Sequence, residues 1–354
     1  MIVPDIVYLH GDSVKQLPEL SDSSRPLFDM IFSAIRPSLL FAAIDLGVFE
    51  LLTRPMSAVE VAEGLGSHEE NTRLLLDALA SIRLLDKMDG RYTNASMTAQ
   101  FLTGGETDLT GALRNEWETS LTMERSVKGL VMDGPPAEEI VLGQGQGGFL
   151  INYQRAGHAQ AIRDVVTSLP EFGRTRRMLD LGSGPGLVSV ALADERPELR
   201  CVLFDRPSMA AAMKGTIERY GCEERFETVL GDYDQDELGS GYDLVLASFS
   251  LYNAGDLVDM MERIRDALAP GGLFISIHEG LRGERTVPEG MVLWNLTYAL
   301  LREDKTFEAG EIATAMESAG LTSIRRFEME MPYGQVEVTL GKRRMNDHPD
   351  IISS

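Results

Sequence analysis

Residues Met178 to Gly186 read MLDLGSGPG. A short apolar stretch begins at Met178 and ends at Asp180, and glycines follow at the alternate positions 182, 184 and 186. The next residues, LVSVALADER, carry apolar side chains at helical spacing. The run therefore predicts a buried strand, a tight glycine-rich turn and the start of a helix. Because the three glycines have no side chains, a ligand can approach the backbone of this turn closely.

Two classes of ligand fit a turn of this kind. A dinucleotide-binding turn needs G-x-G-x-x-G, and its third glycine would fall on Leu187, one residue past Gly186. Asp180 would also repel a pyrophosphate at the strand end. S-adenosylmethionine (SAM) has no phosphate; its carboxylate suits the turn amides and the helix N-terminus, and Asp180 suits its positive end. The turn favours a SAM-type site over a dinucleotide site, with a purely structural glycine turn as the remaining alternative.

Acidic residues follow the ends of the next predicted strands. The second strand, residues 199–204, ends at Asp205, where a carboxylate can accept hydrogen bonds from both ribose hydroxyls. The third strand, 228–230, leads into a Gly-Asp-Tyr segment whose acid could bind the adenine amino group. The fourth strand is YDLVLAS, and the fifth, LFISIH, follows a Pro-Gly-Gly turn. The predicted cofactor-binding residues are Asp180, Gly182, Ser183, Gly184, Gly186, Asp205, Arg206, Gly231, Asp232, Tyr233 and Ser248.

These motifs resemble those of class I SAM-dependent methyltransferases: LDLGSGPG, FDRP around Asp205, GDYD around Asp232 and the APGG turn before a strand. Over residues 30–342, the chain resembles the small-molecule O-methyltransferase family that has an N-terminal winged-helix dimerisation domain. The resemblance implies an α/β fold with a Rossmann-like sheet of seven strands, the last pair closing antiparallel, after a mostly α-helical first domain. It implies SAM as cofactor and S-adenosylhomocysteine (SAH) as product.

The predicted layout has five parts, which differ in composition and periodicity. They are an N-terminal extension at 1–26, a winged-helix-like dimerisation domain at 27–104, a helical linker that covers the acceptor pocket at 105–175, a SAM-binding methyltransferase domain at 176–344 and a tail at 345–354.

The N-terminal part has the element order of a winged helix. Residues 27–52 predict helices interrupted near Pro37, and Ser57 and Ser67 each begin a predicted capping box. DKMDGRYTNA then predicts a hairpin. The helix at 70–85 carries few basic residues and a leucine-rich face, which favours partner packing over DNA reading. The resemblance implies a homodimer in which this domain covers part of the partner's active site.

Composition and charge narrow the class of protein. The chain has 354 residues and a formal net charge of −22, so nucleic acid and anionic membrane surfaces would repel it. No apolar run approaches the ~18 residues that span a bilayer, and we expect no membrane partner. We expect no secretory signal, because the first residues lack a basic region followed by an apolar core, and the two cysteines make no disulfide framework. The five histidines are scattered without metal-ligand spacing. We expect a cytoplasmic enzyme without a metal ion.

The acceptor pocket is expected over the carboxyl ends of the strands. The helix at 149–166 resembles one that the family places over the cofactor and acceptor, and the apolar helix at 291–301 resembles one that lines the acceptor site. Both segments also fit ordinary core helices. The stretch GQGQGG at 143–148 is a candidate lid. The predicted substrate-binding residues are Tyr153, His158, Asn253, Trp294, Asn295 and Tyr298.

The predicted reaction is methyl transfer to a hydroxyl group, which needs in-line positioning and a base for the hydroxyl proton. In the plant-type branch of the family a His-Asp pair follows the fourth strand, and here those positions fall on Tyr252 and Asn253. A neutral phenol with a pKa near 10 is a weak base at pH 7. Three interpretations remain. In the first, Tyr252 orients the acceptor without taking its proton. In the second the acceptor ionises easily, and in the third another group, such as Glu279 or Asp304, is the base.

The sequence predicts a homodimeric SAM-dependent methyltransferase that acts on a hydroxyl of a small aromatic or conjugated molecule. Tyr252, Glu279 and Asp304 are its candidate catalytic residues. Because the usual histidine is replaced, transfer to sulfur or carbon and a SAM-binding protein without methyl-transfer activity remain alternatives. A DNA-binding regulator is the weakest of them.

Overall fold

The computed structural model describes residues 21–135, 146–301 and 304–345, and the side chains of 122–126, 146–149 and 297–298 are outside the description. Residues 143–145 of the proposed lid, the tail beyond Met345 and most of the N-terminal extension therefore fall outside the described residues, whereas residues 146–148 of the proposed lid begin α8. By contacts the chain divides into two compact units, 1–94 and 95–354. Each unit is described by itself.

The first unit consists of short helices and a small antiparallel sheet with the strand order β1-β3-β2. The predicted hairpin is confirmed, with its turn at Asp89-Gly90. The elements are α1 Arg25–Ser33, α2 Ile35–Leu46, α3 Val48–Leu51, β1 Met56–Ser57, α4 Ala58–Leu65, α5 Glu69–Ser81, β2 Leu85–Met88 and β3 Arg91–Asn94.

One predicted capping box is confirmed and the other is corrected. Ser57 accepts a hydrogen bond from the Glu60 backbone N–H at 3.3 Å, and the Glu60 carboxylate accepts one from the Ser57 N–H at 2.7 Å. At the start of α5 the N-cap is His68, whose Nδ1 accepts from the Asn71 N–H at 3.3 Å. Ser67 lies one residue outside the helix and bonds to the Thr72 hydroxyl instead.

The predicted interruption near Pro37 is also corrected. The first break falls at Ala34, between α1 and α2, and the second at Gly47, whose φ is +74°. Pro37 lies in the first turn of α2, where a backbone N–H has no helical acceptor, so a proline costs little there.

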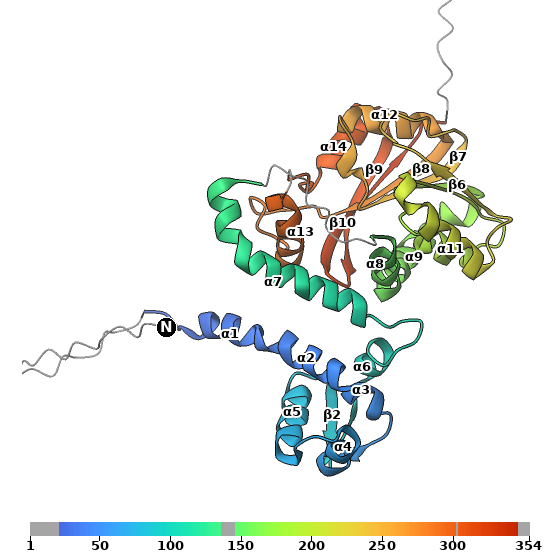
Figure 1. Cartoon of the computed structure of the whole chain (residues 1–354). Coiled ribbons are helices and arrows are strands. Elements are labelled where there is room, and N and C mark those ends of the chain that lie inside the picture. Colours follow the sequence, from blue (N-terminus) through green and yellow to red (C-terminus); the bar gives the residue numbers. More distant parts are fainter. Residues whose placement is uncertain (1–20, 136–145, 302–303, 346–354) are drawn as a thin grey trace, which may run out of the picture. The chain divides into compact units, whose positions relative to one another are not determined.

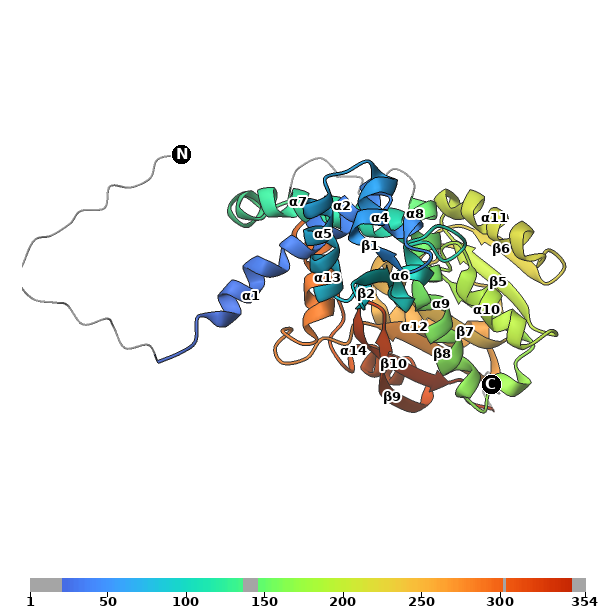
Figure 2. The ribbon, with the colours of Figure 1, turned by 90° about the horizontal axis from the view of Figure 1, so that it is seen from below.

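Residues Arg25–Leu46 correct the expectation about apolar length. With a mean hydropathy of 1.6, this segment is long and apolar enough to cross a membrane by length and composition. Only 11% of its most apolar window is buried, and α1 leads away from α4 and α5 of its unit (Figure 2). Core helices and signal sequences share this length and composition with membrane-spanning helices.

The second unit is a seven-stranded sheet covered by helices on both faces, as predicted (Figure 1). Its elements are α6 Ser96–Phe101, α7 Thr110–Asp133, α8 Gln146–Tyr153, η1 Gln154–His158, α9 Ala159–Ser168, η2 Phe172–Arg174, β4 Arg177–Leu181, α10 Leu187–Glu195, β5 Arg200–Asp205, η3 Pro207–Met209, α11 Ala210–Tyr220, β6 Phe226–Leu230, β7 Tyr242–Ser248, η4 Leu251–Asn253, α12 Leu257–Ala267, β8 Leu268–His278, α13 Glu289–Leu301, α14 Glu311–Ser318, β9 Thr322–Met331 and β10 Gly334–Lys342.

The strand order β6-β5-β4-β7-β8-β10-β9 places the site. The strands from β6 to β8 run parallel, and β10 pairs antiparallel with β8 and β9, which confirms the predicted closing pair. From β4 the chain proceeds outward through β5 and β6, then returns to β7 on the other side of β4. The order therefore reverses between the carboxyl ends of β4 and β7, where open α/β sheets bind ligands. We call this place the switch point.

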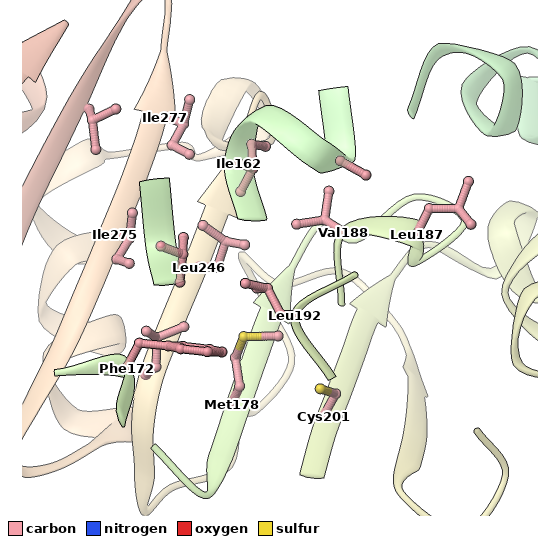
Figure 3. Packing of buried hydrophobic residues seen from close by; sticks show 14 of the residues in the cluster. Ile162, Phe172, Met178, Leu187, Val188, Leu192, Cys201, Leu246, Ile275 and Ile277 are labelled. Carbon is pink, nitrogen blue, oxygen red and sulfur yellow. The ribbon is translucent and has the colours of Figure 1, made fainter. Parts of the chain in front are cut away.

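Alternation along the parallel strands fills two separate cores. Met178, Cys201 and Leu246 face α9 and α10 on one side (Figure 3). Leu179 and Val245 face α12 and α14 on the other. Because both faces of β4, β5 and β7 are buried, the interior of these strands is mostly apolar, and their polar residues collect where the strands end.

Candidate active site

The glycine loop, residues 182–186, follows β4 at the switch point. The N–H groups of Gly182 and Ser183 both donate to the Phe204 carbonyl, at 2.8 and 3.1 Å. All three glycines have positive φ, at +76°, +57° and +84°. A Cβ at Gly182 would lie 2.3 Å from the Ser250 Cβ, and one at Gly186 would lie 2.6 Å from the Leu203 side chain. The loop therefore requires glycine at these two positions, because its backbone packs directly against Ser250 and Leu203.

Asp205 lies against the glycine loop, as the sequence predicted. One carboxylate oxygen accepts from the Gly184 N–H at 2.6 Å and the other from the Arg206 N–H at 2.7 Å. Burial raises the pKa of Asp205, although both backbone bonds act against that rise. This side chain is half-buried at the end of β5, within reach of any ligand that enters the loop.

Asp180 is buried beneath α10, with 3% of its surface exposed. The Ser189 hydroxyl donates to it at 2.6 Å, and burial raises the pKa of this carboxyl to about 7. In this geometry Asp180 ties β4 to the helix that follows the loop. Its predicted contact with the positive end of the cofactor stays a prediction.

The ends of β6 and β7 are joined by Tyr233. Its hydroxyl donates to the Ser250 carbonyl and accepts from the Asn253 N–H at 3.2 Å. Burial raises the pKa of Tyr233 to about 12, so the phenol stays neutral and its hydroxyl holds the segment after β7 in place through these two hydrogen bonds. Asp232 beside it is exposed and can meet a ligand.

Gln154 is a contact of the loop that the sequence analysis missed. Its side-chain oxygen accepts from the Leu187 N–H at 3.0 Å, and its side-chain nitrogen donates to the Ser183 carbonyl at 3.3 Å. Gln154 begins the π-helical turn η1, which ends beyond Gly157 with its φ of +106°. No motif marks this residue, because only the packing of η1 against the loop gives it a role.

An aromatic cluster of Tyr153, Phe249, Trp294 and Tyr333 lies beside the loop. The Trp294 and Tyr333 rings stack at 5.2 Å with 14° between their planes, and the Phe249 ring meets Trp294 edge-on at 5.9 Å. Tyr153 lies 5.4 Å from Tyr333. Two of the four were predicted, whereas Phe249 and Tyr333 were missed; Phe249 holds an uncommon φ of +51° directly after β7.

His158 connects this cluster to β7. Its Nδ1 lies 2.5 Å from the Tyr333 hydroxyl and its Nε2 lies 3.4 Å from the Ser248 hydroxyl. Burial lowers the pKa of His158 to about 4, so the ring is neutral at pH 7. The predicted residues His158 and Ser248 are thus brought together.

Half-buried Tyr252 and buried Glu279 form a pair at the carboxyl ends of β7 and β8. The Tyr252 hydroxyl donates to Glu279 Oε1. Burial raises the pKa of Tyr252 well above its usual value, and the adjacent carboxylate adds to the effect. The Tyr252 ring stacks on Phe307 at 5.8 Å and meets His278 edge-on at 5.5 Å.

His278 has a structural role in the same place. Its Nε2 accepts from the backbone N–H groups of Ser250 and Leu251, both at 3.3 Å. The proton is therefore on Nδ1, which faces the Ser276 hydroxyl at 2.8 Å. Burial lowers the pKa of His278 to about 3, so this ring is a neutral anchor for the segment after β7.

Asp304, the third candidate catalytic residue, has partners other than the Tyr252–Glu279 pair. Asp304 pairs with Arg285 at 2.8 Å and caps the Thr306 N–H at 3.0 Å, in an open hollow of ≈ 830 Å³ at the start of α14. Burial raises the pKa of Asp304, but Thr306 and Arg285 together lower it. This geometry fits a helix-start carboxylate better than a catalytic one.

Asn295, Asn253 and Arg206 are further residues that the sequence predicted to bind a ligand. Asn295 donates to the Met291 carbonyl of its own helix at 3.0 Å, and Asn253 and Arg206 are exposed. The Tyr298 side chain lies outside the described residues. In the part of the chain that the structure describes, no group of three histidine, cysteine or acidic side chains is arranged to hold a metal ion.

Comparisons with known proteins identify the family. The O-methyltransferase dimerisation domain matches residues 28–104, and the O-methyltransferase domain matches 151–322. The chain belongs to this family of class I SAM-dependent methyltransferases that act on small molecules.

Relatives cover nearly the whole chain. The 3-hydroxy-5-methyl-1-naphthoate 3-O-methyltransferase of Streptomyces sahachiroi is 24% identical over 323 residues, 86% of this chain and 92% of the relative. The acetylserotonin O-methyltransferase of Rattus norvegicus is 26% identical over 355 residues, 95% of this chain and 80% of the relative. The crystal structure of the human N-acetylserotonin methyltransferase in complex with SAM has the same fold, with a TM-score of 0.70, 23% identity and coverage of 92% of this chain and 100% of that one.

Proposed function

We propose that this chain binds SAM at the switch point and transfers the methyl group to a hydroxyl of a small aromatic or conjugated molecule, as a cytoplasmic homodimer and without a metal ion. The observation that carries the proposal is the bare glycine loop with the Asp205 carboxylate against it and aromatic rings beside it.

The residues at the switch point fit SAM. The positive φ angles of Gly182, Gly184 and Gly186 shape the loop whose backbone lies against Asp205, and the N-terminus of α10 offers N–H groups to the carboxylate of SAM. Asp205 already accepts two hydrogen bonds from N–H groups, which ribose hydroxyls can replace. Bound there, SAM supplies an electrophilic methyl group, and the aromatic cluster keeps water away from it.

The aromatic cluster supports a flat acceptor. Tyr153, Phe249, Trp294 and Tyr333 present ring faces and edges within a single group. A conjugated acceptor can replace these ring contacts with equivalent ones, because offset stacking and edge-to-face packing are favourable for any aromatic partner.

The N-terminal unit supports a homodimer. α1 has no buried residue, and several of its large apolar side chains are more than half exposed: Leu27, Phe28, Met30, Ile31 and Phe32. The match to a dimerisation domain begins at residue 28. An Ile31→Glu variant is expected to shift a dimer toward monomer in analytical ultracentrifugation, whereas an unchanged sedimentation coefficient would remove α1 from the interface.

Calorimetric titration with SAM and SAH tests the cofactor site. We expect micromolar binding by the wild type and a loss of roughly tenfold to a hundredfold in Asp205→Ala, because hydrogen bonds to a charged group are lost. Glu223→Ala, which removes an exposed carboxylate of the same unit, is the matched control. The proposal would be wrong if the wild type bound neither ligand.

A panel of acceptors tests the reaction. Radiolabelled methyl transfer is measured with phenols, thiols and carbon nucleophiles of similar aromatic size. Transfer to phenols alone supports the proposal. Transfer only to thiols or carbon would move the reaction to the corresponding class, and binding of SAM without any transfer would favour a non-catalytic SAM-binding protein.

A further inference from the structure

Glu279 has two carboxylate oxygens in unequal surroundings. Oε1 accepts a hydrogen bond from Tyr252, whereas Oε2 is buried and has no hydrogen-bond partner. The residue is only 1% exposed. A buried carboxylate oxygen without a donor is costly, so its retention points to a partner that arrives with a ligand.

We propose that Glu279 is the general base of the reaction, that its Oε2 receives the proton of the acceptor hydroxyl, and that Tyr252 positions the carboxylate through Oε1. This inference rests on the proposed methyl transfer and names the residue that makes it possible.

The other candidates at the site are less suited to the role. The Tyr252 hydroxyl already donates a hydrogen bond to Glu279, and its phenolate would have to form beside a carboxylate. Nε2 of His278 is occupied by two backbone N–H groups. His158 has a hydroxyl at each ring nitrogen. Among these groups, Oε2 of Glu279 is the acceptor atom without a donor.

The proton balance is simple. The acceptor O–H bond breaks and an O–H bond forms at Glu279 Oε2, while the S–CH₃ bond of SAM breaks, its electron pair stays on sulfur, and an O–CH₃ bond forms. The products are the methyl ether, SAH and a neutral Glu279, which returns its proton to solvent before the next cycle. No further reactant is needed.

The groups that face Glu279 set its proton affinity. Burial raises the pKa of Glu279, whereas the hydrogen bond from the Tyr252 hydroxyl lowers it; the nearby backbone of Glu279 and Phe307 and the Asn295 amide lower it less, without reaching Oε2 in hydrogen-bond geometry. Its titratable neighbours are Tyr252 after β7, His278 in β8 and Tyr333 between β9 and β10, all neutral at pH 7. Burial therefore brings the pKa of this carboxyl closer to pH 7, and a general base is most effective when its pKa is near the working pH.

Infrared difference spectroscopy of a pH titration tests this carboxyl without any acceptor. A buried protonated carboxyl gives a resolved C=O stretching band. We expect such a band in the wild type, its loss in Glu279→Gln, and its persistence to higher pH in Tyr252→Phe, because the hydrogen bond that lowers the pKa is gone. Glu289→Gln, an exposed acid on α13, is the control. A titration that is identical in wild type and Glu279→Gln would overturn the proposal.

Kinetics with a phenol from the acceptor panel provides the second readout. Glu279→Gln should lower kcat by about 10²- to 10⁴-fold and remove the acidic limb of the pH profile, with SAM affinity unchanged. Tyr252→Phe should lower the plateau of kcat by no more than roughly tenfold and shift the acidic limb to higher pH.

The alternatives give different patterns. If Tyr252 were the base, Tyr252→Phe would abolish turnover and Glu279→Gln would keep it. If the acceptor ionised by itself, both variants would keep kcat, and the pH profile would follow the acceptor pKa. Either pattern contradicts the assignment of Glu279. A wild type that binds no SAM would instead contradict the proposed function, while the infrared titration still reports on Glu279.

Discussion

The two sides of the switch point are built in different ways. On one side the glycine loop and Asp205 come from adjacent segments, and their contacts are mostly to backbone atoms. On the other side the aromatic cluster and the Tyr252–Glu279 pair bring together side chains from α8, the end of β7, the end of β8, α13 and the β9–β10 turn. A backbone site accepts one constant ligand, whereas a side-chain site can be altered residue by residue to suit different acceptors.

Substitution of the first loop glycine should give the largest effect. In Gly182→Ala the new Cβ would overlap Ser250, and the φ of +76° disfavours a side chain, so we expect a loss of roughly 2–5 kcal/mol in the free energy of unfolding and no detectable SAM binding. Urea unfolding and calorimetry measure both.

A control and a rescue sharpen this prediction. Gly215→Ala in α11, where a Cβ would meet nothing within 4 Å, should be neutral or stabilising. Gly182→Ala with Ser250→Gly should regain part of the stability. If the single variant bound SAM normally, the loop would not be the rigid backbone site described here.

The two sides should respond to pH with opposite signs. His158 has a pKa lowered to about 4, so the unfolded chain takes up a proton below pH ~6.5 that the folded chain refuses, and stability falls as the pH drops. Asp180 has a pKa raised to about 7, so the folded chain releases this proton at a higher pH than the unfolded chain does. Stability therefore falls as the pH rises toward 7.

Neutral variants isolate these two terms. When the pH falls from 7 to 5, the charge state of His158 should lower the free energy of unfolding of the wild type by about 2 kcal/mol, and His158→Asn should remove this loss. Over the same range Asp180 should raise the free energy of unfolding by about 2 kcal/mol, and Asp180→Asn should remove this gain. Urea unfolding at both pH values is the measurement. Changes of the same sign in the two variants would show that the burial of one side is wrongly described.

Truncation of a ring should affect only the acceptor. Trp294→Ala removes contacts to Tyr153, Phe249 and Tyr333, and we expect KM for the acceptor to rise about tenfold while the Kd for SAM changes little. Leu293→Ala, on the exposed face of the same helix, is the control. A tenfold loss of SAM affinity in Trp294→Ala would contradict the separation of the two sides.

The smallest effect is expected where a side chain supports the backbone site. Gln154→Ala removes two hydrogen bonds to the glycine loop and should lower the free energy of unfolding by about 1 kcal/mol. The affinity for SAM should fall with it, as the loop loses support. If only acceptor kinetics changed, Gln154 would belong to the other side of the site.

The sequence by itself determined the fold class, the seven-strand sheet with its antiparallel closing pair, and the position of the glycine loop. Apolar strands, glycine turns and strand-end acids are local signals, and they hold wherever a parallel sheet buries both of its faces. The capping box at Ser57 and the hairpin around Gly90 were readable for the same reason.

Only the tertiary structure decided what each site residue does. Asp180 turned toward Ser189 and Asp304 toward Arg285, and Gln154, Phe249 and Tyr333 entered the site without any motif. The resemblance to the plant-type branch implies a histidine at the position of Tyr252, and the tyrosine there gained a chemical meaning only beside Glu279 and its unpaired oxygen. The physical reason is that burial and hydrogen bonding between segments far apart in the chain set proton affinities, and no local pattern encodes those contacts.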